Sequence, residues 1–460
     1  MKTAVILAAG QGKKLWPYAS CRPKAMIPVC NQPVIERQVS QLMQLSFGRI
    51  IIVAGPFSEQ IRHQFRDAAQ VSVIEAADSR GTADALSRAA RLVYQDCLVL
   101  YGDVVLDLSD LKRLSDKLSD SENSVLVTKL DNESASDHIC CRIGQSQDPD
   151  NCQVTEIAGH PRGSGYYRFA AFSLKQPFIP YLAVNSGIFE KLDVGVMPTH
   201  EQHLELSLID WMKDGQVIRA IVTEKGSVDI DKPWHILMAN YAMTVHMCER
   251  LTRTQISEQA SIDETAKIDG HVTLGKGSRI GYHVIIQGNV IIGDHTVIEN
   301  GAIIEGNVVI GDHCRIENYC HISSGTTIGS HCVVSHCAEI SGMLMDGVYL
   351  YHYMEISGLV GTNTDIGAAT VCGSLRFDDR ETLHRVRGRL EQPPHFANAT
   401  YIGDYCRTGV NATIMPGCKT GLHSIIGPGV VLKKDLPDKT LIQVEQQLTT
   451  KEWGPEKYGW

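Results

Sequence analysis

The sequence lacks the patterns that mark several common classes of protein. No apolar run approaches the roughly 20 residues that a transmembrane helix needs. Asp and Glu number 52 against 43 Lys and Arg, a formal net charge of -9, so no basic excess favours a nucleic-acid polymer or an anionic membrane. Any cations that bind phosphate must therefore be gathered locally.

Motifs that hold zinc or form redox dithiols are missing as well. The 14 cysteines include the neighbours Cys140 and Cys141 but no Cys-x-x-Cys. The segment from Met1 to Gly10 carries one Lys and runs into a glycine turn without the small-residue cleavage site of a secretory signal. We therefore expect a cytoplasmic location, where most of the cysteines would be buried thiols.

A six-residue repeat fills much of the second half of this chain of 460 residues, whose length predicts two or three domains. From Ile256 to Ile340 an aliphatic residue stands at every sixth position, often followed by Gly. Stacked coils would align these side chains in one continuous core, which a single unit could not form. The repeat therefore predicts a parallel β-helix.

The repeat is interrupted twice, from about Asp346 to Val360 and from Asp378 to Ala399, before it returns at Ile402. We expect both interruptions to be loops that leave the wall of the β-helix, where functional residues tend to lie. Histidines at the corners of the repeat are expected to be solvated turn residues. They are His283, His295, His313 and His331.

Strand-length apolar runs in the first half alternate with helical patterns. The runs Lys2–Ala9, Arg49–Ala54 and Cys97–Tyr101 predict a parallel sheet with crossover helices. Two later helices are expected, from about Glu201 to Lys213, where Thr199 and Gln202 could form a capping box, and from Pro233 to about Leu251. The predicted divisions are a domain over 1–232, a linking helix over 233–255, a β-helix over 256–436 and a tail over 437–460.

The first strand ends in a Gly10-Gln11-Gly12 turn with cations close behind it. Lys13, Lys14, Arg22 and Lys24 all follow within fifteen residues. Backbone N–H groups of a glycine turn and clustered cations suit a triphosphate. Taken alone, the segment fits lysines on a solvated loop as well.

Longer motifs resemble one enzyme family. Residues 6–36 (ILAAGQGKKLWPYASCRPKAMIPVCNQPVIE) resemble the N-terminal signature of the sugar-1-phosphate nucleotidylyltransferases. The segments RGTADAL (80–86), LYGDVV (100–105), VNSGIF (184–189) and SVDIDKPWHIL (227–237) follow in the order that this family uses.

Together with the β-helix, these motifs resemble the archaeal-type bifunctional UDP-N-acetylglucosamine pyrophosphorylase and glucosamine-1-phosphate acetyltransferases. The stretches 367–388 and 401–417 resemble that subgroup's C-terminal segments. The resemblance implies an α/β Rossmann-like nucleotidyltransferase domain followed by a left-handed parallel β-helix of hexapeptide repeats, assembled as a homotrimer.

The resemblance also implies the chemistry of the first site. A sugar 1-phosphate oxygen attacks the α-phosphorus of a nucleoside triphosphate and expels pyrophosphate, which requires cations and Mg²⁺. Lys14 and Lys24 would be the catalytic cations, and Asp103 with Asp231 or Asp229 would hold Mg²⁺. Asn185 and Arg142 would contact the sugar. The implied nucleotide contacts are Ala8, Ala9, Gly10, Gln11, Gly12, Lys13, Gly81, Thr82, Tyr101 and Gly102.

Three departures leave the substrates open. Glu75 and Ala76 stand where the uridylyltransferases carry a Gln that reads uracil, and a carboxylate cannot make the same donor and acceptor pair. Cys141 replaces a Gly near the sugar, and Gly159 falls where a Glu contacts the amino sugar. UTP and UDP-N-acetylglucosamine are the expected nucleotide and product.

In the β-helix the resemblance implies a general base that takes a proton from a sugar amine as it attacks acetyl-CoA. His352 matches that base, and His suits the role near neutral pH. Ser374, Arg376, Arg407 and Thr408 would contact the acceptor or acetyl-CoA. Glu355 and Ser374 depart from the family's Tyr and Asn at those positions.

Two alternatives remain. In the first, the chain is a monofunctional nucleotidylyltransferase for glucose or mannose 1-phosphate with dTTP, GTP or ATP, and the β-helix is an oligomerisation scaffold. In the second, it is a sugar-nucleotide sensor without catalysis. The intact Lys24 and Asp103 argue against the sensor.

Overall fold

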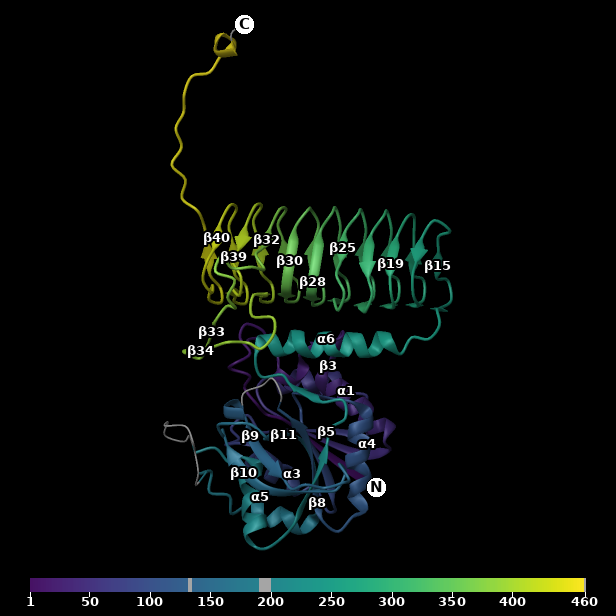
Figure 1. Ribbon diagram of the computed structural model, residues 1–460, viewed down its shortest axis with the longest axis vertical. Helices are drawn as coiled ribbons and strands as arrows, with labels where there is room; N and C mark the ends of the chain where they lie inside the picture. The colour runs from purple at the N-terminus through teal and green to yellow at the C-terminus, as the bar shows by residue number, and fades with distance from the viewer. Residues whose placement is uncertain (131–134, 190–199, 459–460) are drawn as a thin grey trace.

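The computed structural model describes residues 1–130, 135–189 and 200–458. An N-terminal α/β domain lies at one end and a long β-helix at the other, with α6 (Pro233–Glu249) running between them (Figure 1). Thr199, expected in a helix cap, lies outside the described residues.

The N-terminal domain is built on a nine-stranded sheet. The order is β5 (Val71–Glu75), β4 (Phe47–Ala54), β1 (Lys2–Ala8), β6 (Cys97–Tyr101), β11 (Tyr167–Leu174), β8 (Asn123–Lys129), β12 (Ile218–Val222), β10 (Cys152–Gly159) and β9 (Ile139–Ile143). β1 pairs in parallel with β4 and β6, which confirms the predicted parallel sheet, whereas β11 is antiparallel to both its neighbours β6 and β8. The sheet is therefore mixed beyond β6.

Helices cover both faces of this sheet. α3 (Thr82–Ala90) and α5 (Leu204–Lys213) pack on one face, and α1 (Val34–Gln44), α2 (Ser58–Gln64) and α4 (Leu108–Asp116) pack on the other. Side chains of β1 alternate between the two cores, so the strand is apolar from Ala4 to Ala8. The smaller elements are β2 (Pro28–Val29), β3 (Gln32–Pro33), β7 (Val104–Leu106), β13 (Ser227–Asp229), η1 (Lys24–Met26), η2 (Lys117–Ser119), η3 (Ala135–Asp137), η4 (Gln176–Leu182) and η5 (Pro455–Tyr458).

The second half forms the predicted β-helix. Ile280, Ile298, Ile316 and Val334 lie directly above one another, 18 residues apart, so three hexapeptides make one coil. These side chains are 0% exposed and line one continuous core. The corner histidines His283, His295, His313 and His331 have φ between 53° and 59° and are exposed, which confirms them as solvated turn residues.

The strands of the coils form three faces. The first holds β14 (Gln255–Ile256), β17 (Val272–Leu274), β20 (Val290–Ile292), β23 (Val308–Ile310), β26 (Thr327–Ile328), β35 (Thr400–Ile402) and β38 (Lys419–Thr420). The second holds β15 (Ser261–Ile262), β18 (Arg279–Ile280), β21 (Val297–Ile298), β24 (Arg315–Ile316), β27 (Val333–Val334), β29 (Tyr349–Leu350), β31 (Asp365–Ile366), β36 (Arg407–Thr408), β39 (Ile425–Ile426) and β41 (Leu441–Ile442). The third holds β16 (Lys267–Ile268), β19 (Ile285–Gln287), β22 (Ile303–Glu305), β25 (His321–Ile322), β32 (Val371–Cys372), β37 (Thr413–Ile414) and β40 (Val431–Leu432).

The first interruption of the repeat is not a loop, so that prediction is wrong. β28 (Glu339–Leu344) and β30 (Glu355–Val360) run across two faces and pair in register, and the corner contact from Ser330 to Asp346 spans 16 residues. The coil is shorter because a corner is lost. Gly342 and Gly358 have φ of 129° and 143°, and a Cβ on Gly342 would collide with the carbonyl oxygen of Gly358.

The second interruption does leave the wall, as predicted. Its strands β33 (His384–Val386) and β34 (Arg389–Glu391) form an antiparallel hairpin that extends toward the N-terminal domain (Figure 1). The hairpin is tied to α6, because the ring of Trp234 lies 5.3 Å from that of His384. The C-terminal segment leaves the last coil and extends away from both domains (Figure 1).

The two domains share a buried apolar cluster. Residues of the segment that follows the glycine turn pack with α6 against the corners and strands of the middle coils. Fully buried members include Leu15, Tyr18, Ile27, Met343, Leu359 and Tyr401. The N-terminal domain therefore contacts the β-helix through buried apolar side chains of both domains.

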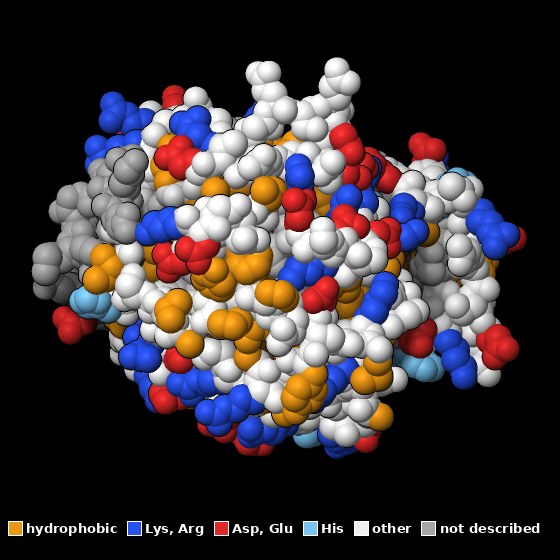
Figure 2. All heavy atoms as spheres, turned by 90° about the horizontal axis from the view of Figure 1, so that it is seen from below, with side chains coloured by type: hydrophobic (Ala, Val, Ile, Leu, Met, Phe, Trp, Pro, Cys, Tyr) orange, Lys and Arg blue, Asp and Glu red, His pale blue; other side chains and the backbone are white. Residues whose placement is uncertain are grey.

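All 14 cysteines are free, with Cys21 half-buried, Cys337 exposed and the others buried, as predicted. No helix among the described residues is long and apolar enough to cross a bilayer. At the N-terminal domain end, Lys and Arg are interspersed with Asp and Glu (Figure 2).

Core packing in the β-helix predicts a stability difference between two isoleucines. Ile316 is 0% exposed and Ile425 is 42% exposed, although both are strand residues of the second face. Ile316→Ala should lower the free energy of unfolding by about 2–5 kcal/mol, because it leaves a cavity. Ile425→Ala should stay within about 0.5 kcal/mol, as exposed positions do. Urea unfolding measures both, and equal losses would contradict the assigned core.

Candidate active site

The glycine turn lies just beyond the carboxyl end of β1. Gly12 has φ of 63°, and a Cβ there would lie 2.8 Å from that of Ala19, so the turn needs glycine. A Cβ on Gly10 would meet nothing within 4 Å, which leaves the backbone open to a ligand. Ala9, Gln11 and Lys13 lie on this same turn, and Lys13 is exposed.

Lys24 lies among three carboxylates. Its Nζ is 2.6 Å from Asp103 Oδ2, 3.2 Å from Asp231 Oδ1 and 3.6 Å from Asp229 Oδ1. Lys14 Nζ lies 2.9 Å from the other oxygen of Asp231. The structure thus brings together both predicted catalytic lysines and all three predicted metal ligands.

The strands β6, β7 and β13 bring the carboxylates of this cluster together. Asp103 follows β6 and Gly102, whose N–H donates to the carbonyl of Leu7 in β1. β13 pairs antiparallel with β7, which places Asp229 opposite Val104. The N–H of Ile230 donates to the carbonyl of Asp103 at 3.0 Å. Residues more than a hundred positions apart are therefore adjacent.

Burial and the neighbouring opposite charges shift the pKa values of the cluster in opposite directions. Burial raises the pKa of Asp103 above its usual value, even though Lys24 acts to lower it. Burial also acts to raise the pKa of Asp231, but Lys24 and Lys14 hold it well below its usual range. Burial acts to lower the pKa of Lys24, and the three carboxylates more than offset this, so Lys24 is a fixed cation.

The donor set suits a divalent cation that substrate oxygens help to hold. No group of three or more His, Cys, Asp or Glu is arranged to bind a metal by itself in the described parts of the chain. Mg²⁺ usually takes only one or two carboxylates together with substrate phosphates and water. Oδ1 of Asp229 is buried and accepts no hydrogen bond among the described residues, so a hard oxygen remains available beside Asp103.

A second group of predicted residues lies where α3 begins. Gly81 has φ of 143°, and a Cβ there would lie 2.5 Å from the carbonyl oxygen of Gln202. Thr82 Oγ1 accepts a hydrogen bond from the N–H of Leu204 at 2.8 Å. Tyr101 OH donates to Glu205 Oε1 at 2.5 Å. These three predicted nucleotide contacts are thus held against residues at the start of α5 or just before it.

The predicted sugar contacts have partners within the chain. Asn185 is 5% exposed and donates to the carbonyl of His203 and to Ser207 Oγ, both at 2.8 Å. The guanidinium of Arg142 lies 4.1 Å from the ring centre of Tyr166. A Cβ on Gly159 would lie 3.0 Å from the ring of Phe189, so this ring occupies the space beside Gly159.

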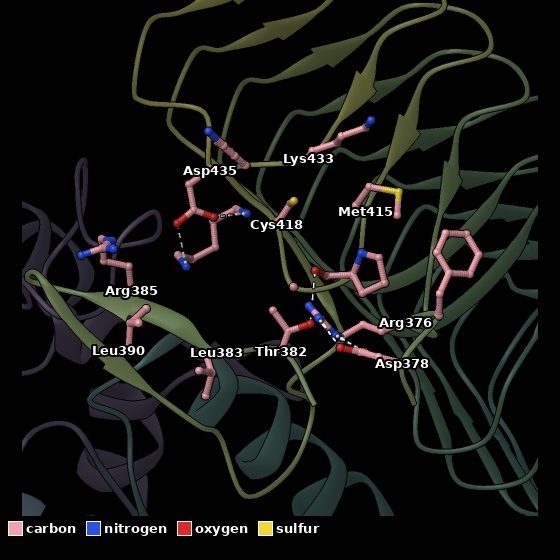
Figure 3. A pocket seen from close by; sticks show the side chains of 15 residues that line it. Arg376, Asp378, Thr382, Leu383, Arg385, Leu390, Met415, Cys418, Lys433 and Asp435 are labelled. Atoms are coloured by element: carbon pink, nitrogen blue, oxygen red, sulfur yellow. Dashed lines mark hydrogen bonds and ion pairs between the residues drawn. The ribbon is translucent and has the colours of Figure 1, made fainter. Parts of the chain in front are cut away.

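A cation-lined cleft of about 880 Å³ lies between the β33–β34 hairpin and the last coils. Arg385, Leu383 and Leu390 lie on the hairpin side, and Met415, Cys418 and Lys433 lie on the side of the coils (Figure 3). Five basic residues line it, against two acidic ones. They are Arg376, Arg385, Lys419, Lys433 and Lys434, with Asp378 and Asp435.

Of the residues predicted for acetyl transfer, Arg376 lines this cleft, where it forms an ion pair with Asp378 at 2.8 Å. Ser374 is exposed two residues before it. Arg407 and Thr408 lie on the second face, and Thr408 is 8% exposed, with its hydroxyl bonded to that of Thr370. His352 is half-buried at a corner.

Three neighbours of the predicted residues were missed. Glu205 is buried on α5, and burial raises its pKa; its place inside an apolar helix pattern was the available signal. His138 Nδ1 lies 4.0 Å from Asp229 Oδ2, and no spacing in the sequence indicates this contact. His336 Nδ1 lies 2.7 Å from His352 Nδ1, so one ring donates and the other accepts. The two histidines are 16 residues apart in the shortened coil, so the 18-residue period of the regular coils does not indicate this pair.

Two known families match parts of the chain. The Nucleotidyl transferase family matches residues 3–170. The GMPPB C-terminal domain matches residues 251–347.

Full-length relatives carry both halves. A bifunctional protein GlmU of Methanococcus maripaludis strain C7 is 30% identical over 458 residues, which cover 97% of this chain and 98% of that protein. A bifunctional sugar-1-phosphate nucleotidylyltransferase/acetyltransferase of Sulfurisphaera tokodaii is 26% identical over 444 residues, which cover 94% and 98%. A UDP-glucose pyrophosphorylase complexed with UDP-glucose aligns with a TM-score of 0.46 and 16% identity, covering 54% of this chain and 99% of that one.

The buried His384 of the β33–β34 hairpin should make the stability of the protein depend on pH. Burial, with Lys419 nearby, lowers the pKa of His384 to about 4, and the ring is 1% exposed. In the unfolded chain this pKa is about 6.5, so between these values the unfolded state binds more protons. The free energy of unfolding should therefore fall by about 2 kcal/mol from pH 7 to pH 5 through this group.

Urea unfolding of wild type and His384→Gln at pH 7 and pH 5 measures this fall in the free energy of unfolding. The variant should lose correspondingly less stability on acidification. His283→Gln, at an exposed corner, is the matched control and should behave as wild type. An acid loss that is the same in all three proteins would contradict the buried neutral imidazole.

Proposed function

This chain belongs to the family of bifunctional GlmU proteins, and from that membership we propose that it joins a sugar 1-phosphate to a nucleoside triphosphate, releasing pyrophosphate. The observation that carries the proposal is the Lys24 cluster, in which two lysines and three carboxylates lie beside an open glycine turn. UTP is the proposed nucleotide and UDP-N-acetylglucosamine the proposed product.

The chain's residues would act by alignment and charge. The backbone N–H groups of the glycine turn bind the phosphates, and Lys14 and Lys24 neutralise charge on them. No protein nucleophile is required, because the sugar phosphate oxygen itself attacks in line. Asp103 and Asp229 or Asp231 would hold Mg²⁺, which when bound would supply further charge neutralisation. Gly81 and Thr82 would lie near the base, and Asn185 and Arg142 near the sugar.

A substrate panel tests this proposal. Pyrophosphate release is measured with UTP, dTTP, GTP and ATP against N-acetylglucosamine, glucose and mannose 1-phosphates, with Mg²⁺ and with EDTA. Turnover should require Mg²⁺ and be fastest with UTP and N-acetylglucosamine 1-phosphate. Faster turnover with another pair would replace the proposed substrates, and no turnover with any pair would refute the proposed reaction.

Asp103→Asn tests the metal assignment. The variant should lower kcat by about 100-fold or more, since a neutral amide is a poorer Mg²⁺ ligand than a carboxylate. Asp67→Asn is the matched control, because the Asp67 side chain is 89% exposed and ion-paired only with Arg66 among the described residues. Unchanged turnover in Asp103→Asn would contradict the assignment.

We propose in addition that the β-helix transfers an acetyl group from acetyl-CoA to glucosamine 1-phosphate. The cation-lined cleft beside Arg376 supports this, since its net positive lining suits the phosphates of a CoA-like ligand. His352 would take the proton from the attacking amine, and its contact with His336 would fix its ring.

His352→Ala should lower acetyl transfer by about 100-fold or more, because general bases contribute roughly that much. Release of the CoA thiol with glucosamine 1-phosphate measures the rate. His283→Ala, at another corner, is the control and should keep the wild-type rate. A wild-type protein that releases no thiol would leave the β-helix as a scaffold for a monofunctional enzyme.

A homotrimer is proposed as the assembly. Apolar side chains other than Ile425 are exposed on the last coils, where Val410 and Val431 are 50% and 49% exposed. Exposed apolar side chains of this kind suit burial against another copy. A monomer by light scattering would contradict this assembly. A cytoplasmic location stays a prediction from the sequence.

A further inference from the structure

The segment that carries the catalytic lysines is held by the β-helix as well as by its own domain. Arg22, two residues before Lys24, forms an ion pair with Asp404 at 2.5 Å and donates to the hydroxyl of Thr362 at 3.3 Å. The Asp404 side chain is 0% exposed and that of Arg22 is 14% exposed. This ion pair therefore lies inside the interface between the domains.

Asp404 also accepts a hydrogen bond from the neighbouring coil of the β-helix. Its Oδ1 accepts the backbone N–H of Thr362 at 2.7 Å, just as Asp312 accepts the N–H of Asp294 at 2.7 Å. Asp312 is exposed, whereas Asp404 is covered by the segment around Arg22. The two aspartates thus make the same hydrogen bond between neighbouring coils, but of the two only Asp404 also contacts the N-terminal domain.

Neighbouring residues reinforce this attachment. Trp16 Nε1 donates to Asp438 Oδ1 at 2.7 Å, at another coil corner. Tyr18 OH donates to the carbonyl of Leu359 at 2.9 Å, and the Tyr18 side chain is 0% exposed. The stretch between the glycine turn and Lys24 is therefore anchored to the β-helix at three places.

The carboxylate side of the cluster is anchored in a similar way. Lys232 follows Asp231 and forms ion pairs with Glu391 of the β33–β34 hairpin and with Asp137. The Lys232 side chain is 5% exposed. The lysine segment and the carboxylate segment are thus both fixed against the second domain.

We propose that Asp404 is a positioning residue for nucleotidyl transfer. Through Arg22 it fixes the segment of Lys14 and Lys24 relative to Asp103 and Asp231, so the β-helix is a structural part of the first site. Removal of Asp404 leaves the guanidinium buried without its partner, which favours release of the segment. The inference rests on the proposed nucleotidyl transfer.

Steady-state kinetics of the full-length Asp404→Asn and Asp312→Asn variants test it. Displacement of the lysines by about 1 Å should raise KM for the nucleotide about tenfold and lower kcat about tenfold or more. KM for the sugar 1-phosphate should stay unchanged, because its predicted contacts lie elsewhere. A simple loss of folded enzyme would lower kcat alone. Asp312→Asn should match wild type, and the same kinetics in both variants would overturn the proposal.

Arg22→Gln provides a second variant that leaves the coil corner intact. It should reproduce the rise in the nucleotide KM, and the double variant Arg22→Gln/Asp404→Asn should be no worse than either single variant. Additive losses would overturn the proposal, because the two residues would then act separately.

Hydrogen exchange gives a readout that does not depend on turnover. The amides of residues 13–24 should exchange faster in Asp404→Asn than in wild type or Asp312→Asn. Equal exchange in all three proteins would overturn the positioning role. A wild type that is inactive with every substrate pair would refute the proposed reaction instead, while exchange would still decide whether Asp404 holds the segment.

Discussion

The ammonium group of Lys24 makes it possible for three carboxylates to lie together in a largely buried site. Asp103, Asp229 and Asp231 would repel one another there, and Lys24 is within 3.6 Å of all three. With Lys14 added, the cluster still has one more negative than positive charge. This balance suits a divalent cation bound together with a substrate polyanion, because each would neutralise the other.

The cluster depends on elements that are remote in the sequence. The β7–β13 ribbon sets Asp229 beside Asp103, and the start of α6 follows directly after Asp231. The lysines lie on a segment whose apolar side chains, such as Leu15 and Tyr18, are buried in the interface with the β-helix. The segment that carries the lysines is therefore packed against the second domain.

Local spacing in the sequence predicted the parts of this structure that are determined locally. The hexapeptide period predicted the core of the β-helix. The carboxylates that meet at Lys24 were predicted by the resemblance of the segments 100–105 and 227–237 to one enzyme family, not by spacing. The shortened coil at Gly342 and Gly358 was mistaken for a loop, because a lost corner and an inserted loop break the period alike. The Arg22 to Asp404 ion pair joins residues in different domains, and no spacing indicates it.

Calorimetric titration of nucleoside triphosphates into the full-length protein tests the central claim most directly. UTP should bind in the presence of Mg²⁺, at least about tenfold more weakly in EDTA, and at least about tenfold more weakly to Lys24→Gln. The same affinity in all three titrations, or no binding of any of the four nucleotides, would contradict the account.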